Sequence, residues 1–288
     1  MWPGVASLTA VRFSRITRRT TVVASCLVTA LLITAVAGCG AETSRSTAPA
    51  KSPGRSATTP EQHQSSNPGV AGAVFEGRRL PVFAPLPPPQ PITAPIGARA
   101  PIYSRLPIHQ RVAFLTMDDG QTQLSTAAPL MAAAHIPFTM FLIGPVAAKN
   151  PQFFQQLVSE GGVIEDHTLT HPIMRGLSYA RQHKEICGAR DLLHSTFQIT
   201  PRFFRPPYGN YDQNTLRAVH DCGLQAAFNW AETVNGGKVY YQTTVHQIQP
   251  GDIILMHFRT AFVNDVIAAL NAIHQAGLTP ALLENYIN

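Results

Sequence analysis

The chain has 288 residues, of which 45% are hydrophobic, so it is long enough for one large globular domain with appendages. Its formal net charge is +6, but residues 1–100 hold ten Lys or Arg against three Asp or Glu, while residues 101–288 hold twelve against thirteen. The basic excess therefore belongs to the N-terminal third. The near-neutral remainder has no basic stripe interleaved with aromatics, which argues against a nucleic-acid partner.

Residues 1–38 have the layout of an export signal. A positive region with Arg12 and Arg15 precedes an apolar run over residues 22–37, which is short for a membrane-spanning helix of about 20 residues. The run ends in Val36-Ala37-Gly38-Cys39, which resembles a bacterial lipobox. We expect a lipoprotein-type signal peptide, lipid on Cys39 and anchoring at the outer face of the cell membrane. The alternative is an ordinary signal peptide with an incidental Cys.

Two segments of low complexity follow the signal. Residues 39–69 are rich in Ser, Thr, Pro, Gly and Gln, which predicts a disordered tether. Residues 70–104 are dominated by proline, as in Pro85-Leu86-Pro87-Pro88-Pro89, which predicts extended chain. The composition leaves open whether this extended segment packs on the domain that follows.

From residue 105 to the C-terminus, apolar runs typical of buried strands alternate with helical patterns. We predict strands at 112–116, 138–143, 163–164, 203–204, 225–228, 253–257 and 280–283, and helices at 125–135, 151–160, 180–198, 213–221 and 263–275. This alternation predicts an α/β fold with a parallel sheet and crossover helices, either open or closed into a barrel.

Polar motifs follow four of the predicted strands. They are Asp118-Asp119, His167 with His171, Arg205–Gly209, and His257. The carboxyl ends of parallel strands face one way, so these side chains are expected to converge on one site. Two adjacent Asp residues at a buried strand end disfavour joint ionisation, so a nearby cation would explain them.

The stretch His167-Thr168-Leu169-Thr170-His171 suggests metal ligands. On a helical turn, the i, i+4 spacing would place both imidazoles on one face. Alone, the pair is more often a coincidence, because short motifs match easily. With a carboxylate from Asp118-Asp119, it becomes a plausible divalent-metal site with open positions.

Cys187 and Cys222 are the cysteines that remain outside the N-terminal leader and its Cys39. In an exported chain they can form a disulfide. Buried free thiols are an equal alternative, because Cys often behaves as a small hydrophobic residue.

The four motifs together resemble the polysaccharide deacetylases of carbohydrate esterase family 4. They are Thr116–Gly120, His167–His171, Arg205–Gly209 and Leu255–His257, and they occur in the family's order from about residue 105 to the C-terminus. The resemblance implies a distorted (β/α) barrel with fewer than eight units over residues 105–288. It also implies a hydrolase that removes acetyl groups from N-acetylated sugars in chitin, peptidoglycan or related polymers.

The resemblance also implies roles for individual residues. Asp119, His167 and His171 would bind the metal, most often zinc, with cobalt, manganese or nickel as alternatives. Asp118 would be the general base, oriented by Arg205, and His257 the general acid. The oxyanion and substrate side would be formed by Tyr208 through its backbone N–H, with Pro207, Trp230 and Leu255.

One stretch departs from the family pattern. Residues 229–237 lack the Asp that supports the acid His and a second Trp, and Glu232 or Asn235 would have to stand in. Milder departures are Gln121, where proline is usual, and Gly162, where His is common. The departure motivates an alternative, a catalytically weak or inactive glycan-binding protein, and hydrolysis of a non-carbohydrate amide or ester is a third reading. We expect a monomer whose partners are an acetylated polysaccharide and, through lipid, the membrane.

Overall fold

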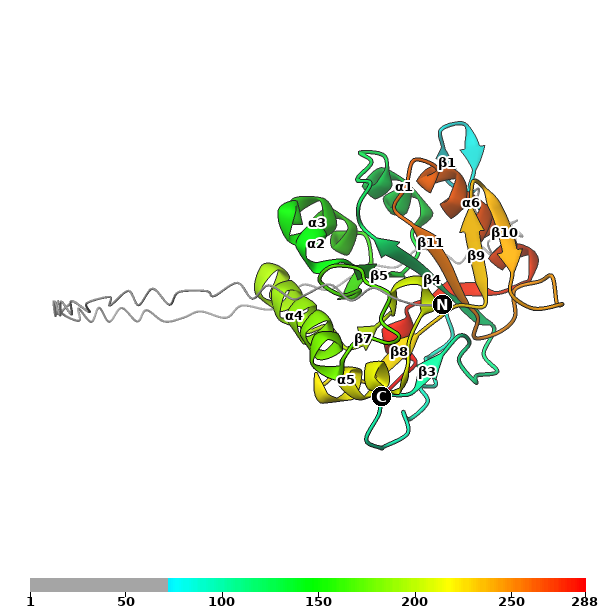
Figure 1. Cartoon of the computed structure of the whole chain (residues 1–288). Helices are drawn as coiled ribbons and strands as arrows, with labels where there is room; N and C mark the ends of the chain where they lie inside the picture. Colours follow the sequence, from blue (N-terminus) through cyan, green and yellow to red (C-terminus); the bar gives the residue numbers. More distant parts are fainter. Residues whose placement is uncertain (1–71) are drawn as a thin grey trace, which may run out of the picture. The chain divides into compact units, whose positions relative to one another are not determined.

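The computed structural model describes residues 72–288 (Figure 1). The predicted signal peptide, the lipid anchor at Cys39 and the predicted tether lie outside the described residues. Among the residues described, no helix is both long and apolar enough to cross a membrane.

A curled sheet forms the centre of the fold. Its strand order is β10-β9-β11-β4-β5-β6-β7-β8-β3, with β12 also paired to β4, and all pairings except β9 with β10 are parallel. The strands are β3 (Ile102–Tyr103), β4 (Val112–Asp119), β5 (Phe138–Leu142), β6 (Gly162–Asp166), β7 (Phe203–Phe204), β8 (Ala226–Phe228), β9 (Glu232–Asn235), β10 (Lys238–Tyr241), β11 (Ile253–His257) and β12 (Thr279–Ala281).

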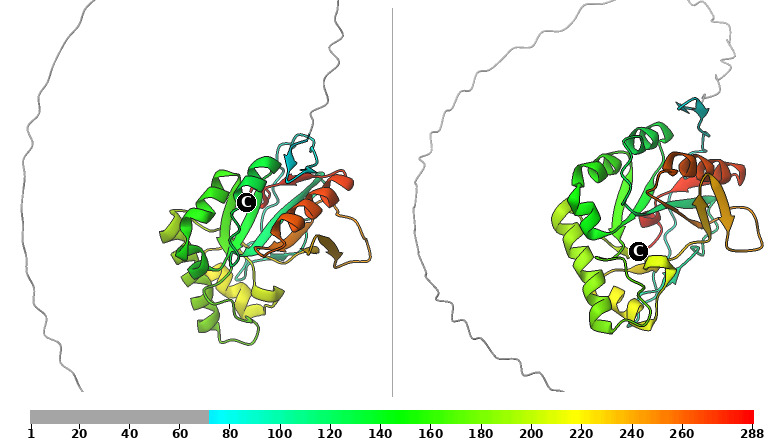
Figure 2. Two further views of the ribbon diagram at one scale, coloured as in Figure 1. Left: turned by 90° about the horizontal axis from the view of Figure 1, so that it is seen from above. Right: turned by 45° about the horizontal axis from the view of Figure 1, so that its top comes forward.

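Within residues 72–288, six α-helices lie around the outside of the curled sheet (Figure 2). They are α1 (Ala127–Ala134), α2 (Gly144–Lys149), α3 (Pro151–Ser159), α4 (Tyr179–Phe197), α5 (Gln213–Asp221) and α6 (Phe262–Gln275), with short 3-10 turns η1 (Pro207–Gly209) and η2 (Leu283–Asn285). The predicted (β/α) barrel with fewer than eight units is thus confirmed.

The central strands are apolar because helices or other parts of the barrel cover both of their faces. Seven of the eight residues of β4 are buried, as are all five of β5. Gly162 begins β6 where a side chain has no room, since a Cβ there would lie 2.7 Å from the ring of Phe138. This contact accounts for glycine at a position where the family pattern often has His.

The segment between β3 and β4 connects the β3 edge of the sheet to the residues just before β11. Arg105 and Asp252 form an antiparallel bridge and an ion pair, and Leu106 N–H donates to Gly251 O at 2.9 Å. The curled sheet is thereby joined to itself between β3 and β11.

Part of the Pro-rich segment packs on the domain. A hairpin of β1 (Val74–Phe75) and β2 (Arg78–Arg79) forms near its start, and Ile92 pairs with Ile287 near the C-terminus. Phe75, Phe83 and Ile92 contact the hydrophobic core. These apolar side chains explain why an extended, proline-rich chain follows the domain surface.

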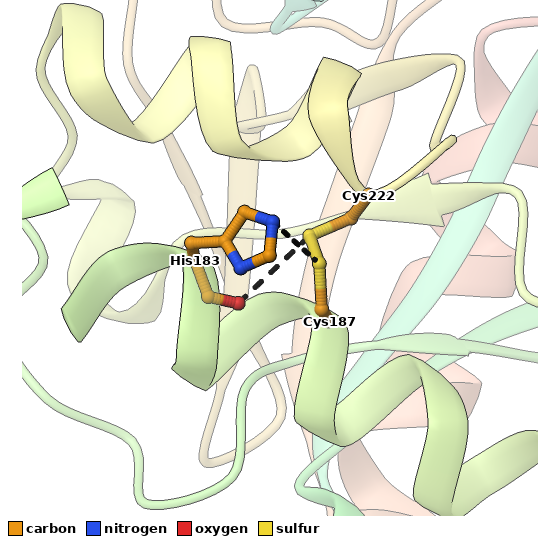
Figure 3. Close-up of side chains that lie close together, drawn as sticks. All are labelled: His183, Cys187 and Cys222. Carbon is orange, nitrogen blue, oxygen red and sulfur yellow. Dashed lines mark hydrogen bonds between the residues drawn. A yellow bond between two sulfur atoms is a disulfide. The ribbon is translucent and has the colours of Figure 1, made fainter. Parts of the chain in front are cut away.

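Cys187 on α4 and Cys222, which follows α5, form a disulfide with a Cα–Cα distance of 5.2 Å (Figure 3). Of the two alternatives from the sequence, the structure contains the disulfide. His183 Nε2 lies 3.3 Å from Cys187 Sγ. Because both sulfur atoms are used in the bond, this trio offers no pair of thiolates to a metal.

Candidate active site

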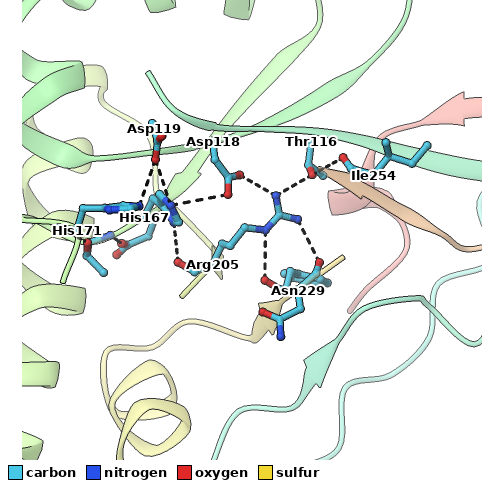
Figure 4. A network of polar contacts seen from close by, with 11 residues as sticks. Thr116, Asp118, Asp119, His167, His171, Arg205, Asn229 and Ile254 are labelled. Carbon is cyan, nitrogen blue, oxygen red and sulfur yellow. Dashed lines mark hydrogen bonds and ion pairs between the residues drawn. The ribbon is translucent and has the colours of Figure 1, made fainter. Parts of the chain in front are cut away.

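Residues of three of the four predicted polar motifs meet at the carboxyl ends of the central strands (Figure 4). Asp118 and Asp119 end β4, His167 and His171 follow β6, and Arg205 follows β7. His257 ends β11, directly opposite Asp118 in the parallel register. Cys39 is the single predicted site residue that lies outside the described part of the chain.

Arg205 explains how Asp118 is tolerated in the protein interior. Its Nη1 donates to Asp118 Oδ1 and to Thr116 Oγ1, both at 2.7 Å, and the Arg205 side chain is fully buried. The guanidinium lies 4.2 Å from the centre of the Phe141 ring. A buried charge pair needs this kind of complete hydrogen bonding, so Arg205 fixes the orientation of the Asp118 carboxylate.

Asp119, His167 and His171 form a compact set of donor atoms. Asp119 Oδ1 lies 3.5 Å from His167 Nε2 and 3.3 Å from His171 Nε2. All three donor atoms lie within 4.8 Å of one another. His167 Nδ1 donates to Arg205 O at 2.7 Å, so Nε2 is the ring nitrogen that faces the Asp119 carboxylate.

This donor set fits a divalent metal ion. Asp119 Oδ1 is buried and has no hydrogen-bond partner within residues 72–288, and a bound cation would give this oxygen a ligand contact. Burial alone would raise the pKa of Asp119, but the imidazoles of His167 and His171 outweigh it and hold that pKa well below its usual range. Two imidazoles and one carboxylate with open positions are a common ligand set for zinc and similar ions.

The His167–His171 segment is a loop, so the expectation of a helical turn was wrong. Thr168 has φ 72° and His171 has φ 56°, both in the left-handed region that helices avoid. The loop is held by side chains, because Thr168 N–H donates to Asp166 Oδ1 and His171 N–H donates to Thr168 Oγ1. The imidazoles approach one another through this loop, with ring centres 4.9 Å apart.

His257 faces the same side of the sheet as Asp118, but neither expected stand-in supports it. Glu232 pairs with Ile254, whose side chain points to the opposite face from that of His257. Burial, with the neighbouring Asp252, raises the pKa of Glu232 to about 9. Asn235 instead accepts a hydrogen bond from Arg259 at 2.9 Å.

His257 Nδ1 therefore has no hydrogen-bond partner within residues 72–288. Burial lowers the pKa of His257 below its ordinary value, and the positive charge of Arg259 lowers it further, while Asp118 opposes the shift. His257 thus lies opposite Asp118, and no carboxylate within residues 72–288 accepts a hydrogen bond from its Nδ1.

The remaining predicted residues surround the site. Tyr208, on the η1 turn after Arg205, is 65% exposed and its ring lies 4.7 Å from that of His171. Pro207 is buried, and Leu255 is buried beside Thr116. Trp230 packs on Gly209 so closely that a Cβ there would lie 3.0 Å from the indole ring.

Thr116 and Asp166 also support this site, although neither role was predicted from the sequence. Thr116 Oγ1 donates to Ile254 O at 2.7 Å and accepts from Arg205, while Asp166 Oδ1 accepts from Thr168 N–H at 2.8 Å. Their position within strands was a usable signal, because a buried polar side chain needs a hydrogen-bond partner.

Comparisons with known proteins agree with this geometry. A family model for polysaccharide deacetylase matches residues 106–227, which include three of the four motifs. An uncharacterized protein of Streptomyces coelicolor is 36% identical over 61% of this chain and 73% of its own length. A chitooligosaccharide deacetylase of a Bradyrhizobium species is 31% identical over 51% of this chain and 70% of its own length.

Solved structures share this fold. The crystal structure of a CE4 family pseudoenzyme from Bacillus anthracis superimposes with a TM-score of 0.56 at 18% identity, covering 64% of this chain and 67% of that one. At this level of identity the similarity concerns the fold.

Proposed function

This chain belongs to the polysaccharide deacetylase family, and from that premise we propose that it is a metal-dependent hydrolase of N-acetylated sugars in a cell-wall or extracellular polysaccharide. The products would be acetate and a free amino sugar. The observation that carries the proposal is the placement of the Asp119–His167–His171 donor set directly beside the buried Asp118–Arg205 pair.

Asp119, His167 and His171 would hold the metal, with zinc as our first choice and cobalt, manganese or nickel as alternatives. A divalent cation bound there supplies a Lewis acid that polarises the acetyl carbonyl and makes water more acidic. The protein itself keeps the His167 ring in the tautomer whose Nε2 is free, through its hydrogen bond to Arg205 O.

Asp118 would act as general base through one defined oxygen. Its Oδ1 accepts the hydrogen bond from Arg205, whereas its Oδ2 lies 3.7 Å from His167 Nε2, on the side of the donor set. Oδ2 is therefore the oxygen placed to accept a proton from the attacking water. The hydrogen bond from Arg205 keeps the carboxylate oriented for that step.

His257 and Tyr208 would complete the reaction. His257, opposite Asp118 in the sheet register, is placed to protonate the departing amine. The backbone N–H of Tyr208, next to His171, would stabilise the oxyanion of the acetyl group. Pro207, Trp230 and Leu255 would form the walls around the substrate.

A second candidate function is glycan binding with little or no catalysis. The specific observation that favours it is the buried His257 Nδ1, which has no partner among residues 72–288. An acid without a carboxylate to orient its ring and raise its pKa would protonate the leaving amine poorly.

The N-terminal sequence indicates where in the cell the reaction would take place. We propose that Cys39 carries lipid and holds the enzyme at the outer face of the bacterial membrane, where cell-wall glycan is within reach. Replacing Cys39 by Ser should release the protein from the membrane fraction. Retention of that variant in membranes would remove the lipoprotein proposal.

The direct test is acetate release from N-acetylglucosamine oligomers and from peptidoglycan, with zinc or cobalt added. Asp118→Asn is the matched variant, because its amide can still accept from Arg205 but cannot take a proton. Acetate release by the wild type and a loss of about 100- to 10,000-fold in the variant would support the enzyme. Glycan binding without acetate release, with the same affinity in Asp118→Asn, would favour the glycan-binding protein. Acetate release only from non-carbohydrate amides or esters would favour a hydrolase of such compounds.

A further inference from the structure

The loop that carries both candidate histidine ligands has no regular secondary structure of its own. Thr168 and His171 adopt positive φ angles of 72° and 56°, which cost energy for residues with a side chain. Such a loop keeps one conformation only where surrounding groups hold it. The two ends of the loop are the ligands themselves, so the middle is where a support would act.

Helix α4 supplies that support through Glu185. The Glu185 carboxylate accepts from both donors of Thr170, with Oε2 bound to the backbone N–H and Oε1 to the hydroxyl, each at 2.8 Å. The backbone carbonyl of Glu185 accepts from Leu169 N–H at 3.2 Å. A single helical residue thus binds the middle of the loop at three points.

Packing along α4 reinforces this contact. Gly188, three residues after Glu185, lies against Leu169 so closely that a Cβ there would be 2.6 Å from the Leu169 side chain. Glu185 itself is 6% exposed, and its side-chain hydrogen bonds within residues 72–288 all go to Thr170. A carboxylate buried against one residue of a ligand loop is better explained by that loop than by general stability.

We propose that Glu185 is a positioning residue for the metal site, which holds the loop so that His167 and His171 are already placed before a metal ion binds. The proposal rests on the proposed function, since it assumes that His167 and His171 bind a metal. Groups that orient metal ligands commonly change metal affinity by about 10- to 100-fold. Without Glu185, the loop would have to become ordered when the metal binds, which would weaken binding.

The test compares two variants of the same helix, measured with the purified full chain. Glu185→Ala removes both side-chain hydrogen bonds to Thr170. Gln182→Ala is the matched control, because Gln182 is equally buried on α4 but binds Leu177 O, Asp212 and Thr215 instead. Affinity is measured with cobalt by its visible absorption and with zinc by competition against a chelator.

We expect Glu185→Ala to weaken cobalt and zinc binding by about 10- to 100-fold and Gln182→Ala to leave it within about threefold. Hydrogen exchange should accelerate at the amides of Leu169 and Thr170 in Glu185→Ala alone. Wild-type affinity in Glu185→Ala, or equal weakening in both variants, would overturn the proposal.

Two further variants keep the test decisive if Glu185→Ala fails to fold. Glu185→Gln can still accept from Thr170 N–H and donate to Thr170 Oγ1, so we expect near-normal affinity. Thr170→Val removes only the hydroxyl bond, so we expect a smaller loss than in Glu185→Ala, about threefold to tenfold. Normal affinity in Thr170→Val, together with strong loss in Glu185→Gln, would contradict the role assigned here.

The result of the Glu185 test can be distinguished from the result of the acetate-release test of the proposed function. A wild-type chain that binds neither cobalt nor zinc would overturn both proposals. A wild-type chain that binds metal but releases no acetate would remove the deacetylase while leaving the Glu185 comparison valid. Normal metal affinity in Glu185→Ala with active wild type would remove the positioning role alone.

Discussion

At the scale of single residues, Arg205 connects most parts of the site. Its side chain donates to Asp118, Thr116 and Phe228 O, and its carbonyl accepts from His167. Arg205 therefore orients the proposed base with its side chain and one proposed metal ligand with its backbone. A lysine could not reproduce these contacts, because its ammonium lacks the planar fork of donors.

Arg205→Met should destabilise the fold, because it leaves the Asp118 carboxylate buried without its partner. We expect the free energy of unfolding to fall by about 3 to 5 kcal/mol. Urea unfolding of the metal-free protein measures this change. The double variant Arg205→Met/Asp118→Asn should recover part of the loss, and a change below about 1 kcal/mol in the single variant would contradict the role of the pair.

Arg259 should tune the proposed acid through its charge. Arg259 lowers the pKa of His257, in addition to the effect of burial, and a general acid works only while protonated. Activity is therefore lost as pH rises through the pKa of His257, and Arg259→Gln should move this loss to higher pH. A pH–rate profile measures the shift, with exposed Arg217→Gln as the control that should leave the profile unchanged.

At the scale of elements, α4 both stabilises the fold and contacts the candidate site. Ser178 caps its N-terminus, Glu185 contacts Thr170 in the His167–His171 loop, and Cys187 bonds the helix to the residue that follows α5. The helix thus joins the loop after β6 to the part of the chain that follows the Arg205 turn. The loop after β6 and the segment that follows Arg205 are therefore connected through α4, which lies outside the sheet.

Loss of the disulfide should lower the free energy of unfolding, because the unfolded chain without this cross-link has more conformational entropy. The bond joins residues separated by 35 positions, and closing a loop of this length in the unfolded state is worth about 3 to 4 kcal/mol. We expect the double variant Cys187→Ser/Cys222→Ser to lose about this much free energy of unfolding in urea. Peptide mapping without reduction should find the Cys187–Cys222 pair in the wild type, and its absence would refute the bond.

At the scale of the whole molecule, the C-terminus is anchored at a pair of acidic side chains. Glu284 on η2 accepts from Thr139 Oγ1, while buried Glu165 on β6 accepts from the backbone N–H groups of Arg202 and Phe203. Arg202 donates to the carbonyls of Glu284 and Ile287. Burial raises the pKa of Glu284 to about 7, and burial together with the charge of Glu284 raises that of Glu165.

These raised pKa values predict a protein that is less stable at higher pH. The folded form of Glu284 holds its proton up to about pH 7, whereas the unfolded chain releases it near pH 4.5, so the folded state binds more protons between these values. The contribution of Glu284 to the free energy of unfolding is fully present below about pH 4.5. It is lost as pH rises through about 7, and the loss amounts to at most about 3 kcal/mol.

Urea unfolding at about pH 5 and about pH 8 tests this prediction. Glu284→Gln keeps an acceptor for Thr139 but carries no titrating proton, so its stability should fall less between the two conditions. An equal pH dependence in wild type and variant would show that Glu284 does not titrate in this way.

Several elements were predictable because their signals are local. Helix α5 has the predicted bounds because Asp212 and Thr215 form a capping box at its start. The predicted strand at 112–116 is in fact longer, since β4 continues through the two Asp residues that the site requires. The hairpin of β9 and β10 was missed, although its Gly236-Gly237 loop is a recognisable turn signal.

The His167–His171 loop shows where local reasoning failed. Its spacing fits a helical turn, but the backbone takes positive φ angles at Thr168 and His171 instead. Contacts from Asp166 and from Glu185 on α4 stabilise that conformation. Those partners are set by the packing of separate elements, so the spacing of the histidines carries no information about them.

The sequence by itself determined the alternation of strands and helices and the set of residues that meet at the strand ends, whereas the barrel class was implied by the resemblance to carbohydrate esterase family 4. The alternation follows from the hydrophobic periodicity of the sequence. The convergence of the residues follows because the carboxyl ends of parallel strands lie at the same edge of the sheet. Only the tertiary structure decided that Cys187 bonds to Cys222, that Glu232 faces away from His257, and that Glu185 accepts a hydrogen bond from Thr170 in the His167–His171 loop. The physical reason is that each of these depends on short-range contacts between residues distant in sequence, whose distances and orientations exist only once the elements have packed.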